Sequence, residues 1–314
     1  MSSIQVAAVE SVGMTVAHME RSLEFYTTVL DFKQVFDVEV SGDEYDRLLG
    51  LSHTRLRVVR LQLGNEILEL TEYLSTKGRP MPADSRSHDQ WFQHLAIVVS
   101  NIEQACQRLE AYQVQQVSID PQTIPESNPV SGGVKALYFQ DPDGHRLELI
   151  EFPLDKGEAK WQQSNQLFLG IDHTAIVVFS IETSLQFYRD CLKLELKTQS
   201  KNSGTEQENL SKVQDAKVCV SSLKALTGLG IELLEYLKPC TGRPMPVNVQ
   251  PNDVFHWQIT IAVPDVAIVA QQLQSKGFFS ASSKATVMPD LTLGFKRGIL
   301  VRDPDGHGIR LIEK

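Results

Sequence analysis

The sequence lacks the features that define several common protein classes. Its 314 residues include only four cysteines (Cys106, Cys191, Cys219 and Cys240) and no CxxC pair, too few for a disulfide scaffold. No apolar run approaches the roughly 18 residues of a membrane span, and Met1–Gln5 show no secretory signal. Lys and Arg number 30 against 39 Asp and Glu, a net charge of −9, with no basic stripe to contact phosphates. We therefore expect a cytoplasmic protein with neither a nucleic-acid nor a membrane partner.

What the sequence does contain is an internal repeat with an offset near 162 residues. Four motifs recur in the same order in both halves, which chance does not explain, so the chain is a tandem duplication. The first copies are E-R-S-L-E-F-Y-T-T-V-L at 20–30, E-L-T-E-Y-L at 69–74, G-R-P-M-P at 78–82 and D-P-D-G-H at 141–145. The second copies are E-T-S-L-Q-F-Y-R-D-C-L at 182–192, E-L-L-E-Y-L at 232–237, G-R-P-M-P at 242–246 and D-P-D-G-H at 303–307.

Each half divides again into two similar units. A unit begins with an apolar strand and continues with a short amphipathic helix, as the spacing of Leu23, Tyr26 and Leu30 indicates. Three further strands complete it, the last two joined by a turn such as Asp141-Pro142-Asp143-Gly144. This pattern predicts an α+β protein of four βαβββ modules, at 8–77, 92–152, 170–238 and 255–314. The modules form two domains, 1–152 and 169–314, joined by a polar linker, 153–168.

Four such modules, with a first-strand His, an R-S-L-x-F-Y helix and a D-P-D-G-H-x-x-E-L-I-E ending, resemble the vicinal oxygen chelate superfamily. That superfamily includes glyoxalase I, extradiol dioxygenases, methylmalonyl-CoA epimerase and bleomycin-resistance proteins. The resemblance covers nearly the whole chain and implies two half-open barrels. It is specific for the fold and weak for the reaction, because one fold hosts many chemistries.

The resemblance also implies where metal ligands would lie, on the first and last strands of paired modules. The positions are Ser11 and Glu69 in module one, His94 and Glu148 in module two, His173 and Glu232 in module three, and Gln258 and Arg310 in module four. Imidazole and carboxylate bind divalent ions, whereas a hydroxyl ligates poorly and a guanidinium never donates. Gln replaces a His ligand in some glyoxalases, so Arg310 is the stronger sign of a lost site.

The pairing of modules decides whether a complete site exists. Pairing one with two and three with four, as in extradiol dioxygenases, damages both sites. Pairing two with three and one with four leaves one intact metal site, formed by His94, Glu148, His173 and Glu232, and one decayed site. We favour the second pairing, because decay of one copy after duplication would leave this pattern.

Three functions follow from the resemblance. The first is a metal-dependent, glyoxalase-I-like lyase or isomerase acting on a small α-hydroxycarbonyl substrate. One Ni²⁺, Zn²⁺, Co²⁺ or Mn²⁺ ion would stabilise the enediolate, and Glu148 or Glu232 would serve as both ligand and catalytic base. The second is an Fe(II) ring-cleaving dioxygenase, and the third is a non-enzymatic binding or resistance protein. Each has a small-molecule partner and is compatible with a monomer or a homodimer.

Several other residues carry weaker expectations. His145 and His307 follow turn glycines and are expected to be exposed, as are His18, His53 and His88. His256 would become a ligand only if the alignment were shifted. The Pro- and Gly-containing loop 124–133 suits either a lid or an ordinary surface loop. Arg79 and Arg243 of the G-R-P-M-P motifs suit a structural crossover better than a substrate carboxylate clamp.

Overall fold

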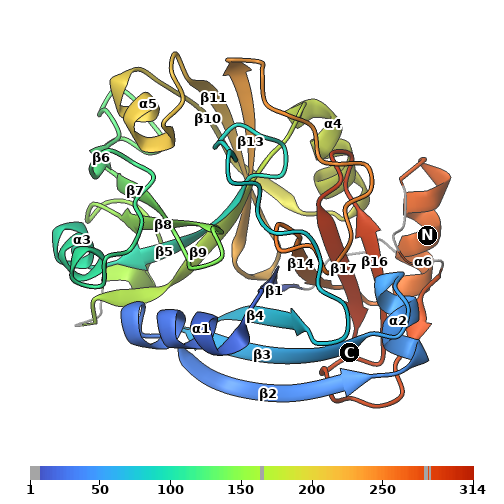
Figure 1. Ribbon diagram of the computed structural model, residues 1–314. Helices are drawn as coiled ribbons and strands as arrows, with labels where there is room; N and C mark the ends of the chain where they lie inside the picture. The colour runs from blue at the N-terminus through green and yellow to red at the C-terminus, as the bar shows by residue number, and fades with distance from the viewer. Residues whose placement is uncertain (1–7, 163–165, 279–281, 283) are drawn as a thin grey trace.

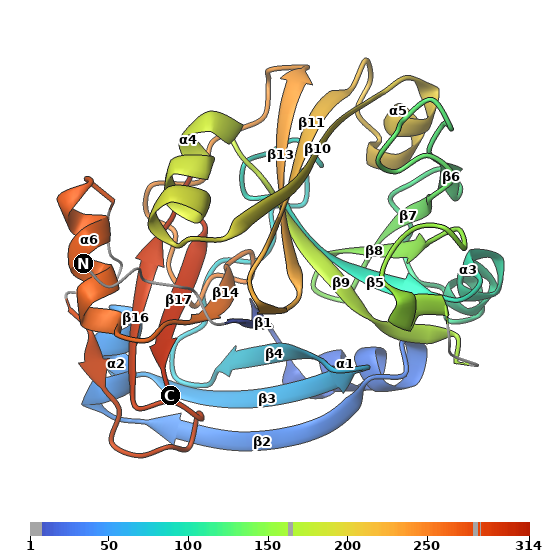
Figure 2. The same ribbon diagram turned by 180° about the vertical axis from the view of Figure 1, so that it is seen from behind.

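The computed structural model describes residues 8–162, 166–278, 282 and 284–314, which form two strongly curved sheets (Figures 1 and 2). Each sheet joins one module from each half of the chain. The first runs in the order β10 (Glu195–Ser203), β11 (Lys217–Lys224), β13 (Gly230–Lys238), β9 (Phe168–Val177), β5 (Gln93–Val99), β8 (Arg146–Glu151), β7 (Lys135–Gln140) and β6 (Gln122–Thr123). Module two therefore pairs with module three, as we expected from the distribution of ligand-type residues.

The second sheet combines modules four and one. Its order is β15 (Thr286–Val287), β16 (Arg297–Arg302), β17 (Gly308–Glu313), β14 (Trp257–Ala262), β1 (Ala8–Thr15), β4 (Glu66–Tyr73), β3 (Arg55–Leu63) and β2 (Lys33–Ser41), with the short β12 (Thr227–Gly228) beside β1. The division into residues 1–152 and 169–314 follows the sequence repeat, whereas each sheet crosses it. In both sheets the modules meet through antiparallel first strands, β5 with β9 and β1 with β14.

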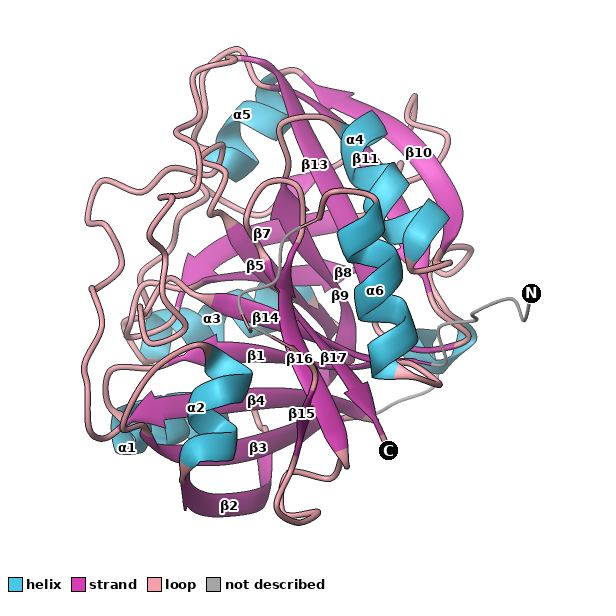
Figure 3. Cartoon of the chain, turned by 90° about the vertical axis from the view of Figure 1, so that its right-hand side faces the viewer, coloured by secondary structure: helices cyan, strands magenta, loops and turns pink. Residues whose placement is uncertain are grey.

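Short helices pack against the sheets, and Figure 3 shows α4 and α6 on the same side of the molecule. The α-helices are α1 (Met19–Glu24), α2 (Asp43–Leu49), α3 (Ile102–Ala111), α4 (Ile181–Leu185), α5 (Thr205–Ser211) and α6 (Val266–Ser275). Two of them bridge the edge strands of a sheet: α2 contacts β2 and β15, and α5 contacts β10 and β6. Wider π-helical turns, Phe25–Val29 and Gln186–Cys191, continue α1 and α4, and a 3₁₀ turn, Ala159–Gln162, lies in the linker. None of these helices is long and apolar enough to cross a bilayer in the described part of the chain.

Helix starts follow the sequence directly. The side chain of Asn101 accepts a 2.8 Å hydrogen bond from the Gln104 amide at the start of α3, and Asp265 accepts one from Ile268 at the start of α6. Such caps satisfy amides that have no partner within the helix. The buried faces of the helices then pack on the sheets, where the core is continuous between the two.

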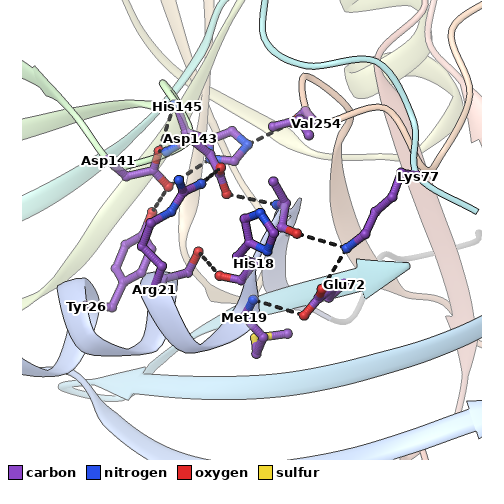
Figure 4. A network of polar contacts seen from close by, with 12 residues as sticks. His18, Met19, Arg21, Tyr26, Glu72, Lys77, Asp141, Asp143, His145 and Val254 are labelled. Carbon is purple, nitrogen blue, oxygen red and sulfur yellow. Dashed lines mark hydrogen bonds and ion pairs between the residues drawn. The ribbon is translucent and has the colours of Figure 1, made fainter. Parts of the chain in front are cut away.

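The first Asp and the His of each D-P-D-G-H turn are buried, so the expectation that His145 and His307 are exposed is wrong. His145 has no exposed surface; its Nδ1 lies 2.8 Å from Asp141 Oδ2, and its Nε2 lies 2.7 Å from the carbonyl of Val254 (Figure 4). Tyr26 donates a 3.1 Å hydrogen bond to the same Asp141 carboxylate. Asp141 and His145 are thus buried between modules one and four, where their polar atoms find partners, whereas Pro142 of the same turn is exposed.

The same contacts recur in the other half of the duplication. His307 is buried with Nδ1 2.9 Å from Asp303 Oδ2, and Tyr188 donates to that carboxylate at 2.9 Å. Gly144 and Gly306 sit in the two turns with φ of 88° and 99°, which favours glycine. Each turn therefore connects one sheet to the other.

The two G-R-P-M-P motifs also connect modules. Arg79, which follows module one, forms two hydrogen bonds to Asp253 at the start of module four, at 3.0 and 2.6 Å. Arg243 does the same to Asp89 at the start of module two, at 3.1 and 2.7 Å. The guanidinium groups are thereby engaged by protein carboxylates, which confirms the structural interpretation of the motif.

Candidate metal centre

Residues from both halves of the chain converge inside the first sheet. His94 on β5, Glu148 on β8 and His173 on β9 each offer a ligand-type atom, and these atoms all lie within 4.8 Å of one another. His94 Nε2 lies 3.4 Å from His173 Nε2 and 3.2 Å from Glu148 Oε2. His173 Nε2 lies 3.6 Å from the same carboxylate oxygen.

Glu232, on β13, stands at the edge of this group. Its Oε2 lies 3.4 Å from His173 Nε2, and its side chain is 23% exposed, against 7% for Glu148. Burial raises the pKa of Glu232, and the neighbouring carboxylates of Asp172 and Glu148 add to the rise against the opposing effect of His173. Glu232 is therefore the less firmly held of the two carboxylates.

The strand register explains why these side chains meet. His173 is paired with Ala96 across the β5–β9 seam, and Ala96 is paired in turn with Glu148 on β8. Gly230 on β13 lies beside His173, where an added Cβ would come 3.2 Å from the His173 Cβ. Small residues at these neighbouring positions leave room for the imidazole and carboxylate groups.

Asp172 positions the ring of His173. Its Oδ2 lies 2.9 Å from His173 Nδ1, which turns Nε2 toward His94 and Glu148. Burial alone would lower the pKa of His173, but Glu232 first, and then Asp172 and Glu148, raise it to about 9. A carboxylate behind a ligand imidazole is the usual arrangement in metal sites, because it fixes the tautomer.

The arrangement fits a divalent ion of intermediate hardness. Two imidazole nitrogens and a carboxylate oxygen face one another at the bottom of a cup, and such a set repels itself unless a cation or proton lies between its members. A second carboxylate stands within reach. All four residues predicted from the sequence are thus brought to one place.

The equivalent positions in the second sheet form an ion-pair cluster instead. Glu69 is fully buried, with Oε1 2.8 Å from Arg310 Nη2 and Oε2 3.0 Å from Arg60 Nε. Arg310 also donates to Thr260, and Arg60 to the carbonyl of Leu293. Two guanidinium groups occupy the place where a cation would bind.

The other two equivalent positions in the second sheet, Ser11 and Gln258, do not form a pair of metal ligands. Ser11 and Gln258 are buried, and the Gln258 side chain packs against Gly13. His256 lies just before β14 of this sheet, with Nδ1 3.3 Å from Arg302 Nη1, and burial lowers its pKa far below the usual range. Leu293 and Phe295 are buried over the cluster, whereas the loop at the same place in the first sheet borders a cavity.

That cavity, of about 170 Å³, lies over the His–Glu group and adjoins a second of about 530 Å³. The loop 124–133 lines both. Asn128 in this loop donates a 2.8 Å hydrogen bond to Asn202 on β10, which ties the loop to the opposite module. Other lining residues that the sequence did not single out include Asp172, Tyr138, Lys156, Ser200 and Gln207.

Comparison with known proteins assigns the family. A model of the Glyoxalase/Bleomycin resistance protein/Dioxygenase superfamily matches residues 8–149 and again 170–311, so the chain belongs to this superfamily. The two matches cover most of both repeats.

Individual relatives are named as enzymes. A 2-epi-5-epi-valiolone epimerase from Actinomyces sp is 34% identical over 151 residues, 46% of this chain and 80% of that protein. The lactoylglutathione lyase of Salmonella typhimurium is 28% identical over 143 residues, 44% of this chain and 87% of that protein.

Solved structures share the overall architecture. Glyoxalase I from Zea mays aligns with a TM-score of 0.62 at 17% identity, covering 99% of this chain and 92% of the maize chain. A putative dioxygenase from Bacillus subtilis aligns with a TM-score of 0.57 at 14% identity, covering 99% and 86%. At these identities the likeness shows the fold.

Proposed function

We propose that this protein is a divalent-metal-dependent lyase or isomerase that moves a proton beside the carbonyl of a small α-hydroxycarbonyl compound. The convergence of His94, Glu148 and His173, with Glu232 adjoining, carries this proposal. Relatives named as an epimerase and a lyase support the same broad reaction class. Ni²⁺, Zn²⁺, Co²⁺ and Mn²⁺ all suit this donor set.

The four side chains have different roles in this proposal. His94, His173 and Glu148 hold the ion, and when bound it polarises the substrate carbonyl and stabilises the negative charge that develops. Glu232 is the base. Its carboxylate contacts only His173 and is more exposed than that of Glu148. It is therefore free to take the α-proton and return it.

The rest of the cup binds and shields the substrate. Hydroxyl and amide groups of Ser200, Asn202 and Gln207 line the cavity beside apolar Ile124 and Val220. The loop held by Asn202 limits the access of water to the reacting carbon. Exclusion of water strengthens every electrostatic interaction in the site.

Metal analysis with site variants tests the proposal. We expect about one Ni, Zn, Co or Mn per chain in the purified protein, and loss of the ion in His94→Ala and His173→Ala. Glu151→Gln is the control, because Glu151 lies on β8, the strand of Glu148, but accepts a hydrogen bond from Ile102 at the start of α3. A protein that binds none of these ions on reconstitution would overturn the proposal.

Proton exchange tests the reaction itself. The probes are dihydroxyacetone and the methylglyoxal–glutathione adduct in D₂O, and NMR measures the loss of their α-protons. This exchange should require the ion. Glu232→Gln should retain metal and lose at least 100-fold in exchange rate, as removal of a general base does. Full exchange activity in Glu232→Gln would rule out its role as the base.

A second candidate function is an Fe(II) ring-cleaving dioxygenase. The observation in its favour is that two histidines and one carboxylate form the group, the set that non-haem iron oxygenases use. Among the described residues that line the cavity, His94 and His173 are the histidines, which leaves no third one to act as acid or base. One iron per chain together with oxygen-dependent catechol cleavage would establish this function instead.

A further inference from the structure

A third cavity lies beside the C-terminal end of β13, in addition to the two over the proposed metal centre, and the duplication shows what it lacks. In the first half, two basic side chains, each about half exposed, lie at the corresponding place (Figure 4). Arg21 pairs with Asp143. Lys77 Nζ lies 2.7 Å from Glu72 Oε1 and 2.9 Å from the carbonyl of Ala17.

In the second half the two carboxylates remain. Asp305 accepts a 3.1 Å hydrogen bond from the Phe179 amide, as Asp143 does from Ala17 at 2.9 Å. Glu235 accepts a 2.8 Å hydrogen bond from Ile181, as Glu72 does from Met19. The backbone framework around the acids is therefore the same in both halves.

Neither cation is kept at its position in the second half. Thr183 stands in place of Arg21. Lys-Pro-Cys-Thr at 238–241 stands in place of Ser-Thr-Lys at 75–77, so the lysine of this segment comes earlier, at the end of β13. Among the described residues, no Lys or Arg forms an ion pair with Asp305 or Glu235. Burial, followed by the neighbouring charge of Asp303, raises the pKa of Asp305.

A cavity of about 740 Å³ opens where those two side chains would lie. Asp305 and Glu235 are on its wall together with apolar side chains of Val177, Phe179, Leu237, Pro239 and Pro244. Phe179 is 76% exposed, although it is a large aromatic residue. The cavity therefore combines an apolar surface with two carboxylates that have no Lys or Arg partner among the described residues.

His88 also lines this cavity, and it is buried, contrary to the expectation from the sequence. It is 95% buried and its Nδ1 has no hydrogen-bond partner among the described residues. Its counterpart in the other half, Asn252, donates a 3.2 Å hydrogen bond to the carbonyl of Thr76. His88 Nε2 lies 3.4 Å from Thr241 Oγ1 in the equivalent segment, so only Nδ1 of this buried ring is left without a partner among the described residues.

We propose that this cavity binds an organic cation, a guanidinium or ammonium group carried on an apolar body. Asp305 and Glu235 bind the charged group as Asp143 and Glu72 bind Arg21 and Lys77, and Phe179, Leu237 and Pro239 contact the apolar part. Burial of a guanidinium against carboxylates gives paired, charge-assisted hydrogen bonds. The first half of the chain carries its cations covalently, and the second takes one from solution.

Calorimetric titration of the full chain tests this site, with benzamidine and acetyl-arginine amide as probes and neutral benzamide as control. We expect one benzamidine per chain and no benzamide. The dissociation constant should rise about tenfold in Asp305→Asn and in Glu235→Gln, since a charge-assisted hydrogen bond contributes that much. If acetyl-arginine amide binds more tightly than benzamidine, the natural ligand is an arginine side chain. If benzamidine binds more tightly, the natural ligand is a free small cation.

Thr183→Arg is the decisive variant. Thr183 is exposed, so the change leaves the fold intact while supplying the guanidinium that Arg21 supplies in the first half. It should abolish benzamidine binding, whereas Glu182→Arg, one residue away, should not. The inference is overturned if wild-type protein binds neither cation at millimolar concentrations, or if Thr183→Arg binds as tightly as wild type. Repeating the titration after metal removal keeps this result independent of the metal centre.

Discussion

Arg310 and Glu69 form a 2.8 Å ion pair at the two positions that Glu148 and Glu232 occupy in the other sheet. The same fold thus holds two carboxylates in one cup and a carboxylate with a guanidinium in the other. Arg60 completes the second cluster at 3.0 Å. One copy of the duplicated site keeps the proposed ion-binding set, and the other has an internal salt bridge at the equivalent positions.

Breaking that salt bridge should be costly. Arg310→Met leaves Glu69 buried with one partner fewer, and we expect the free energy of unfolding to fall by about 3 kcal/mol. Urea denaturation measures this loss of unfolding free energy. The double variant Glu69→Met with Arg310→Met should recover much of the loss. Arg55→Met, which breaks an exposed pair with Glu39, should cost less than about 1 kcal/mol; an equal cost would contradict the distinction.

Asp172 should tune the metal centre without touching the ion. Asp172→Ala removes the partner of His173 Nδ1, so the dissociation constant of the metal should rise roughly 10- to 100-fold. Asp172→Asn keeps a hydrogen-bond acceptor and should raise the dissociation constant less. Competition with a chromogenic chelator gives both constants. Unchanged affinity in the alanine variant would remove Asp172 from the site.

The buried His145–Asp141 pair should make stability depend on pH. Burial alone would lower the pKa of His145, but Asp141 raises it to about 9, above the unfolded value near 6.5. The pair's contribution is therefore complete below about pH 6.5 and is lost as the pH rises through about 9. At the acid end, the lowered pKa of Asp141 preserves its contribution until the pH falls below that group's ordinary value.

Urea unfolding of wild type and His145→Gln at pH 6 and pH 9 isolates this effect. The difference between the two proteins should be larger at pH 6. A constant difference for His145→Gln would show that the pair is not charged.

The loop 124–133 should become more mobile when its contact with β10 is removed. Asn202→Ala deletes the acceptor for Asn128, a bond that contributes about 1 kcal/mol, so the amides of Gly132 and Gly133 should exchange with solvent about fivefold faster. Hydrogen exchange detected by mass spectrometry reads this directly. Gln199→Ala, on the same strand but bonded to Ser221, should leave loop exchange unchanged.

Much of this architecture could be predicted from the sequence, because the duplication repeats the same pattern of strands and helices in both halves. The repeats predicted four modules. Arg310 stands where a metal ligand would be expected, and only one pairing of modules leaves a full set of ligand-type residues around His94, so this position predicted which modules pair. The metal role of that set stays a prediction. The topology and the convergence of the side chains are properties of the structure.

Other features were out of reach because they depend on contacts between modules. A histidine after a turn glycine is usually exposed, and only the packing of the turn under Tyr26 and Val254 buries His145. Repetition of D-P-D-G-H in both halves was the available signal, because a solvent-facing turn has little reason to keep its histidine. Asp172 precedes a predicted ligand, but nothing in its local pattern distinguishes it from a surface residue.

The crossing of the sheets between halves has a consequence for synthesis of the chain on the ribosome. All seven residues of β5 are buried, and the strand that covers one of its edges, β9, is made some seventy residues later. Until then the first half exposes an apolar strand edge with no partner, the kind of edge that promotes aggregation. Both sheets of this protein are therefore completed only after the second half has been translated.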